Sequence, residues 1–141
     1  MATFNKFDDF VEQLCLGKHN LAAAQDVVKV FLSNELPLAT DTIKTDIAEI
    51  TVENGYTPAG GKDITNDITV VTGTAQLTGN DVTWTASGGS FGPFQYVIIY
   101  NDTQTSPVDP LIGWWDYGSA LLVLDGESFT VDFGLTVLTV A

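Results

Sequence analysis

The first third of the chain carries apolar residues at helical spacing. Aromatic and aliphatic side chains recur three or four positions apart near its start, at Phe4, Phe7, Phe10, Val11 and Leu14. Because residues at this spacing share one face of an α-helix, the pattern predicts an amphipathic helix over residues 5–16, which Gly17 ends. Asn5 and Asp8 suit the cap and the first turn of this helix. A β-branched run then predicts a strand over residues 27–32.

The next segment has a mixed pattern. Ile43, Ile47 and Ile50 fall on one helical face, and the preceding Thr-Asp pair can supply a cap, so a short second helix is predicted. The stretch ENGYTPAGG then concentrates Asn, Gly and Pro within a few residues. It predicts a surface loop over residues 53–61.

From residue 64 onward, short apolar runs alternate with turn residues. The runs are DITVVTGTAQL, VTWTA, FQYVIIY, LIGWWDY, LLVL, SFTVDF and LTVLTV. At least six strands with short connections predict a mainly β fold, an antiparallel sandwich or barrel. Asp125-Gly126 predicts a hairpin turn between LLVL and SFTVDF. We expect one globular domain, in which residues 1–21 form an N-terminal helix or arm and residues 22–141 form the β-rich part.

Composition and charge narrow the range of partners. The chain has 141 residues, of which 45% are hydrophobic and 16% charged, as in folded domains. Its net charge is -13, it has five lysines and no arginine, and no basic residue follows Lys62. Nucleic acids and anionic membranes bind clustered Lys and Arg, so neither is an expected partner. The first residues lack the pattern of a signal peptide, which predicts a protein made in a cytoplasm.

Residues for chemistry are sparse. Cys15 and His19 are the single members of their types, too few for a zinc site, and no nucleophile and base stand together. We expect Cys15 in the core and His19 in a turn with local hydrogen bonds. Acids in turns and in a first helical turn have local explanations. No catalytic residue, cofactor or metal site is therefore predicted, although NDTQTSPVDP and GKDITND leave calcium open.

Aromatic residues gather in the middle third of the chain. They are Trp84, Phe91, Phe94, Tyr96, Tyr100, Trp114, Trp115 and Tyr117. They can form a core with a subunit interface, or a platform on which sugar rings stack. Neighbouring residues of a strand point to opposite faces, so Trp114 and Trp115 can serve a core and an interface at once. This favours the interface.

Five segments of the sequence resemble a known family. They are FDDFVEQLCLGKHNL, VVKVFLSNELP, DIAEI with NGYTPAGG, GPFQYVIIYND, and DPLIGWWDYGSALLVLDGESFTVDF. Together they resemble small virion proteins of tailed bacteriophages, and nearly the whole chain is covered. Members of that family are similar to head decoration or cement proteins rather than to enzymes. The resemblance implies a homotrimer on the outside of the capsid, made in the host cytoplasm, with the major capsid protein as its partner.

The candidate interface residues are aromatic. Phe4, Phe7 and Phe10 are expected to form an attachment stripe. One of Trp114 and Trp115, together with Tyr117, is expected at a subunit interface. The alternative function is a head- or tail-borne adhesin that binds glycans, and a small hydrolase is the weakest reading.

Overall fold

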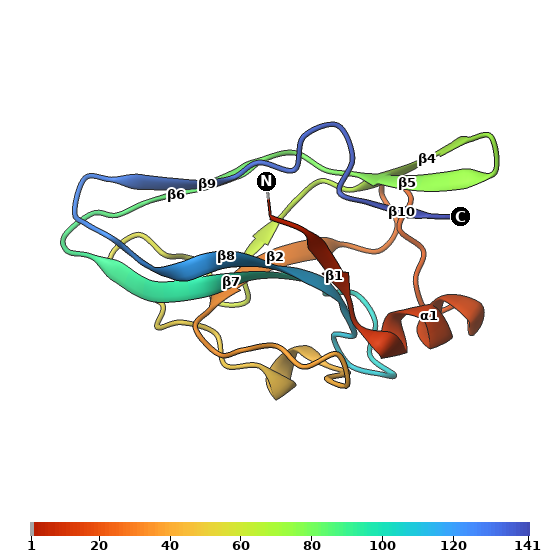
Figure 1. Cartoon of the computed structure of the whole chain (residues 1–141), viewed down its shortest axis with the longest axis horizontal. Helices are drawn as coiled ribbons and strands as arrows, with labels where there is room; N and C mark the ends of the chain where they lie inside the picture. Colours follow the sequence, from red (N-terminus) through yellow and green to blue (C-terminus); the bar gives the residue numbers. More distant parts are fainter. Residues whose placement is uncertain (1) are drawn as a thin grey trace.

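Strand pairing gathers the chain into three antiparallel sheets. The computed structural model describes residues 2–141. The largest sheet has the order β1 (Phe4–Lys6), β8 (Leu111–Val123), β7 (Phe91–Asn101), β2 (Val28–Ser33) and β3 (Lys62–Asp63). A second sheet contains β10 (Leu138–Val140), β5 (Thr74–Thr78) and β4 (Asp67–Val71), and a third pairs β6 (Val82–Thr85) with β9 (Ser128–Val131). The two smaller sheets lie end to end above the largest one in Figure 1, which confirms the predicted mainly β, antiparallel fold.

The alternation of side chains on β7 explains where the two cores lie. Val97 and Ile99 point into the space between the sheet layers and belong to the main core. Tyr96, Ile98 and Tyr100 point to the opposite face and belong to a second core. The connection between β2 and β3 runs beneath that face (Figure 1). Because both faces of this part of β7 are covered, residues 96–100 form a continuous apolar run.

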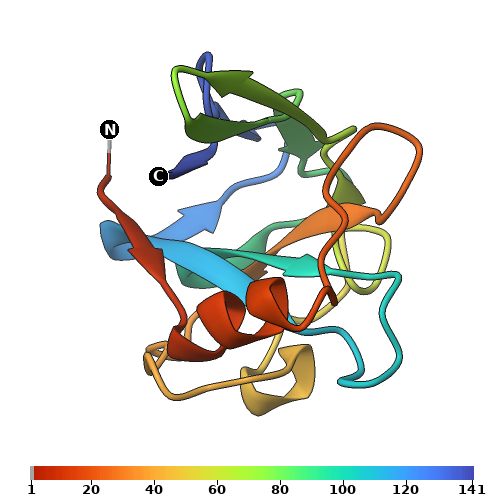
Figure 2. The same cartoon turned by 90° about the vertical axis from the view of Figure 1, so that its right-hand side faces the viewer.

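The N-terminal helix is confirmed, but it begins later than predicted. Residues Phe4–Lys6 form β1, which pairs antiparallel with Gly113–Trp115 of β8. Helix α1 spans Asp8–Cys15, lies in the foreground of Figure 2, and ends before Gly17, whose φ is +73°. The sheet satisfies the backbone groups of residues 4–6, and the Phe7 N–H donates to the Ile112 carbonyl at 3.2 Å. Sheet pairing therefore overrides the helical spacing of the first two phenylalanines.

The predicted second helix is wrong. The isoleucine segment contains only one 3₁₀ turn, Lys44–Asp46. Ile43 forms an antiparallel bridge with Pro110, and the Lys44 N–H donates to the Asp109 carbonyl at 2.9 Å. These contacts with the loop between β7 and β8 hold the segment extended on both sides of the turn.

The predicted loop over residues 53–61 contains a core residue. Tyr56 is fully buried, and its ring lies 5.3 Å from that of Trp84 and 5.7 Å from that of Phe91. Its hydroxyl accepts a hydrogen bond from the Leu32 N–H at 3.0 Å. The loop therefore does more than connect strands, because it inserts a large side chain between the layers.

The turn at Asp125-Gly126 does not close a hairpin. β8 pairs with β7 and β1, whereas β9 pairs with β6, so the turn carries the chain from one layer to the other. The predicted hairpin between LLVL and SFTVDF is therefore wrong. The crossing buries Val131 and Phe133 in the main core, which a hairpin within the plane of the large sheet would not do.

Candidate functional site

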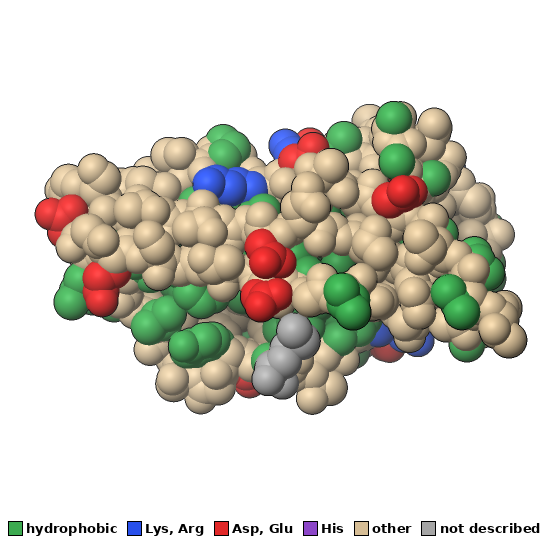
Figure 3. Space-filling view, turned by 90° about the horizontal axis from the view of Figure 1, so that it is seen from above, with side chains coloured by type: hydrophobic (Ala, Val, Ile, Leu, Met, Phe, Trp, Pro, Cys, Tyr) green, Lys and Arg blue, Asp and Glu red, His purple; other side chains and the backbone are tan. Residues whose placement is uncertain are grey.

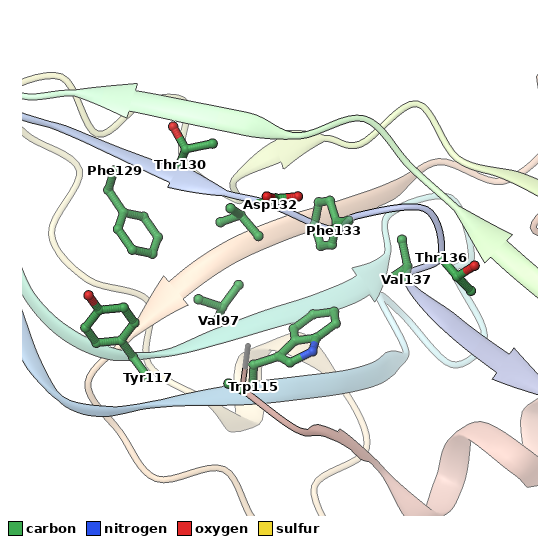
Figure 4. Close-up of a pocket in the computed structure, with 11 residues that line it drawn as sticks. Val97, Trp115, Tyr117, Phe129, Thr130, Asp132, Phe133, Thr136 and Val137 are labelled. Atoms are coloured by element: carbon green, nitrogen blue, oxygen red, sulfur yellow. The ribbon is translucent and has the colours of Figure 1, made fainter.

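A cavity opens between the layers at the β8 edge of the sandwich. Its volume is about 400 Å³, and six of the residues that line it are Val97, Trp115, Tyr117, Phe129, Asp132 and Phe133. We call it the β8–β9 cavity. Figure 4 shows Trp115 and Tyr117 rising from β8 while Phe129 and Phe133 reach toward them from β9 and the chain that follows.

Strand periodicity places these aromatic rings. Trp115 and Tyr117 are two residues apart on β8 and share one face, and Phe129 and Phe133 share a face in the same way. The Tyr117 and Phe129 rings meet edge to face at 6.0 Å between centroids. The Trp115 and Phe133 rings lie 5.7 Å apart. The cavity thus has two aromatic pairs that bridge the layers, with an opening between them.

A large bulge in β8 lies beside the cavity. Tyr96 pairs with Asp116 and Phe94 with Leu121, so two steps along β7 match five steps along β8. The three extra residues leave the ladder, as in an extended β-bulge. Gly118 takes a φ of +99° there, and its N–H donates to Asp116 Oδ1 at 2.7 Å. LIGWWDY and LLVL were predicted as separate runs, but residues 111–123 form the single strand β8, which contains this bulge.

The margin beside the cavity has exposed apolar side chains. β1 pairs only with Gly113–Trp115, and within residues 2–141 no strand pairs with that side of β8 farther on. Tyr117 is 53% exposed, Leu122 46% and Leu124 54%. In the view from above, hydrophobic side chains lie along the lower left margin of the molecule (Figure 3). Tyr117 also belongs to the lining of the cavity, whereas Leu122 lies on the opposite face of β8, because its neighbours Leu121 and Val123 pack into the main core.

The charge around the cavity is negative. Asp132 lines it, and Asp132 Oδ1 accepts a hydrogen bond from the Gly134 N–H at 2.8 Å. Asp116 lies in the bulge, and Asp81 Oδ1 accepts from the Phe133 N–H at 3.0 Å. Acidic side chains dominate the charged groups visible from above (Figure 3). No lysine or arginine occurs in the sequence after Lys62.

The two tryptophans lie on opposite faces of β8, as the alternation predicts. Trp114 packs on Phe7 at 4.5 Å between ring centroids and belongs to the second core. Trp115 points between the layers and lines the β8–β9 cavity with Tyr117. Both indoles are half-buried. Contact of Trp115 and Tyr117 with a sister subunit stays a prediction.

The expected phenylalanine stripe is not an exposed surface. Phe7 is 0% exposed and Phe10 1%, so both pack inside their own chain and cannot form the predicted attachment stripe in this fold. Phe4 is half-buried, with its ring 5.2 Å from that of Trp115. Phe10 and Leu21 belong to the main core. The described part of residues 1–21 is therefore packed against the β-rich part of the domain.

A buried polar cluster around His19 escaped the sequence reasoning. Asn101 Nδ2 donates to Asp26 Oδ2 at 2.8 Å and lies 3.1 Å from His19 Nδ1. Since the amide nitrogen is a donor, His19 Nδ1 accepts and Nε2 carries the proton. Nε2 is buried without a hydrogen-bond partner among the described residues. Burial lowers the pKa of His19 to about 4, although the negative charges of Asp26 and Asp9 oppose the shift.

This cluster corrects the prediction for His19. Its partner is 82 positions away in the sequence, so the expected local turn bonding is wrong. The imidazole is a neutral structural group that joins the N-terminal arm to the end of β7. No sequence signal marks this pairing, because a single histidine and a distant asparagine share no motif.

A second polar cluster fixes the loops beneath the large sheet. Glu49 accepts hydrogen bonds from the Tyr56 hydroxyl at 2.8 Å, the Gly60 N–H at 3.0 Å and Lys44 Nζ at 3.1 Å. The Tyr100 hydroxyl donates to the Gly60 carbonyl at 2.6 Å. Burial raises the pKa of both Tyr56 and Tyr100, so both hydroxyls stay protonated. Because these groups satisfy one another, the cluster is structural.

Three other features complete the description of the surface and its possible sites. Within residues 2–141, no group of three or more His, Cys, Asp and Glu side chains is placed to hold a metal ion. Over the same range, none of the helices has the length and apolar character needed to cross a bilayer. Cys15 is exposed at the end of α1, so its predicted place in the core is wrong.

No protein-family model, curated protein or solved structure matches this chain. The surface of the molecule is therefore the basis for a proposed function. The β8–β9 cavity, the exposed apolar margin and the negative charge are the features that bear on it.

Proposed function

We propose that this protein is a non-enzymatic virion structural protein, a decoration or cement protein that binds the outer surface of a phage head and stabilises the shell. The observation that carries the proposal is the open β8–β9 cavity, whose mainly apolar lining includes Tyr117, a side chain that is 53% exposed. Contiguous exposed apolar surface of this kind marks sites where another protein packs. The sequence resemblance to phage decoration proteins indicates the major capsid protein as that partner.

The charge supports a place on the outside of the particle. A net charge of -13 without arginine repels the phosphates of packaged DNA, so the interior of a filled head is unfavourable. The outer surface imposes no such repulsion. The cytoplasm of the host supplies the protein before assembly in this proposal.

The stabilising effect would follow from mass action. A protein that binds the assembled lattice and not the free capsid subunits favours the assembled state in proportion to its occupancy. The homotrimer implied by the resemblance would add avidity, since three linked copies bind one lattice site together. Native mass spectrometry of the purified protein measures that oligomeric state directly.

Heat release of DNA tests the cement role. Phage heads that lack the protein would be heated alone, with the purified protein, and with an unrelated acidic protein of similar size, and DNA release would be followed with a fluorescent dye. We expect rupture at a higher temperature only in the second sample. Equal rupture temperatures in all three samples would refute the proposal.

A second candidate function rests on the side chains in the cavity. Trp115, Tyr117 and Asp132 line one recess, and sugar-binding sites combine aromatic faces with carboxylates that accept hydroxyl hydrogen bonds. A glycan-binding adhesin is therefore the alternative. In that case Trp115→Ala abolishes binding on a glycan array while the oligomer is unchanged, and an array without hits counts against it.

A further inference from the structure

We propose that the β8–β9 cavity binds a large apolar side chain of an extended partner segment in which lysine or arginine residues flank that side chain. This inference rests on the proposed function, and it specifies the chemistry of the capsid segment that binds there. The partner inserts side chains into the cavity rather than adding a strand to the sheet.

The walls of the cavity select an apolar group. Four aromatic rings contribute to its lining, and Val97 lies between them at the floor (Figure 4). A volume of about 400 Å³ falls within the range of pockets that enclose small ligands. It has room for one large aliphatic or aromatic side chain, whose burial would remove apolar surface of both partners from water.

The charges select basic neighbours for that side chain. Asp132 lines the cavity and Asp116 lies in the adjoining bulge, and both are exposed. Within residues 2–141 neither carboxylate forms an ion pair, since the two salt bridges are Lys29 with Asp102 and Lys44 with Glu49. An approaching lysine or arginine therefore gains an attraction that no residue of this chain supplies.

The same charges argue against a second copy of this chain in the cavity. Each copy carries a net charge of -13, and its own apolar margin is flanked by acids. Two such surfaces would place carboxylates against carboxylates, and like charges at an interface oppose association. A homotrimer would therefore use other faces of the molecule.

The bulge in β8 opposes strand addition along the β8 edge of the cavity. A partner strand needs a regular row of free N–H and C=O groups along an edge. The three extra residues after Asp116 interrupt that row, and Asp116 already binds the Gly118 N–H. Bulges of this kind protect sheet edges from pairing with other chains. Along β8, the side-chain surface is therefore what remains available to a partner.

Indole NMR signals test the cavity without any capsid. The probe is the octapeptide acetyl-Lys-Thr-Lys-Leu-Thr-Lys-Thr-Lys-amide, added to the full-length ¹⁵N-labelled protein. Matched controls carry Glu in place of every Lys, or Ser in place of the Leu. The three indole N–H signals report separately, because Trp84 is buried and Trp114 lies on the opposite face of β8 from Trp115.

We expect the Trp115 signal to shift with the Lys–Leu peptide while the Trp84 signal stays in place. Affinity should fall about tenfold for either control peptide. Equal shifts with the Ser or the Glu peptide, or no shift of Trp115 with any of them, would overturn the inference. A shift that appears with oligosaccharides and not with the peptide would assign the cavity to glycans instead.

Two matched charge reversals test the same cavity on phage heads. Asp132→Lys and Asp125→Lys change the net charge equally, and each wild-type carboxylate accepts one backbone hydrogen bond, from Gly134 and Gly88 respectively. Only Asp132 lines the cavity. We expect Asp132→Lys to weaken binding to heads about tenfold, whereas Asp125→Lys stays within about twofold of wild type.

The outcomes separate the two proposals. If both variants bind heads as well as wild type does, the cavity inference is wrong and the decoration role stands. If the wild-type protein itself does not bind heads, the decoration role fails, and the peptide titration alone decides the chemistry of the cavity. Equal unfolding midpoints of the two variants exclude a folding defect as the cause.

Discussion

Acidification from pH 7 to pH 5 will destabilise the protein by about 2 kcal/mol through His19 alone. The pKa of this imidazole falls from its ordinary value of 6.5 to about 4, chiefly because burial penalises the charged form. Between these two values the unfolded chain binds a proton that the folded chain does not. The free energy of unfolding therefore falls as the pH falls through this window.

Two acids whose pKa values are shifted do not obscure the effect of His19. Burial opposes ionisation of Asp26, but hydrogen bonds from Asn20, Asn101 and Gln104 outweigh it and lower the pKa of Asp26. The stability that Asp26 contributes is present above its unfolded value of 3.8 and is lost only below it. Burial raises the pKa of Asp109, so this group acts in the opposite direction. The contribution of Asp109 to the pH dependence is the same in the wild type and in a His19 variant. It therefore cancels when the unfolding free energies of the two proteins are subtracted.

Urea unfolding at a series of pH values measures the effect, with His19→Leu as the control. The variant removes the titrating group and the buried Nε2–H that has no partner, while Asn101 keeps its bond to Asp26. We expect the difference in unfolding free energy between wild type and variant to change by about 2 kcal/mol between pH 7 and pH 5. Parallel curves for the two proteins would refute the assignment of His19 as a buried neutral group.

Single substitutions and a thiol reaction test three further details of the fold. Gly113→Ala places a Cβ against the Phe4 ring, so it should cost about 2 kcal/mol and speed amide hydrogen exchange in β1. Tyr56→Phe leaves the buried Leu32 N–H without its acceptor, and urea unfolding should show a loss of about 1–3 kcal/mol. Cys15 is exposed and should react fully with a thiol reagent in the native protein, whereas a slow reaction would indicate burial.

Local patterns predicted several of the strands. β2, β6 and β7 were found because continuous or alternating apolar runs are local properties of the sequence. The first helix was also found, but its start was misplaced. Residues 4–6 pair with Gly113–Trp115, more than 100 positions away, and no local rule detects such a pairing. The crossing at Asp125-Gly126 failed for the same reason, since turn chemistry does not reveal which sheet the next strand joins.

The cavity depends on features that the sequence hides. The sequence pointed to one of Trp114 and Trp115, together with Tyr117, but it did not point to Phe129 and Phe133, the rings that face Trp115 and Tyr117 across the cavity. Those rings belong to the opposite layer. Their position therefore depends on the turn after β8, which carries the chain from one sheet to the other. Gly118 was the one visible signal, because a glycine inside a strand pattern often marks a bulge.

The negative charge and the exposed apolar margin act together to limit contact between identical copies at this face. An exposed apolar margin on a β-sandwich invites association of identical copies, and natural sheets limit this with bulges and charges. Here the bulge after Asp116 interrupts strand pairing along β8, while the acidic groups oppose contact between the same faces of two copies. The same charge leaves Asp132 unpaired beside the cavity. In the proposed interaction, a basic partner can therefore bind an apolar surface from which a second copy is repelled. The charge thus selects a basic partner over another copy of this chain.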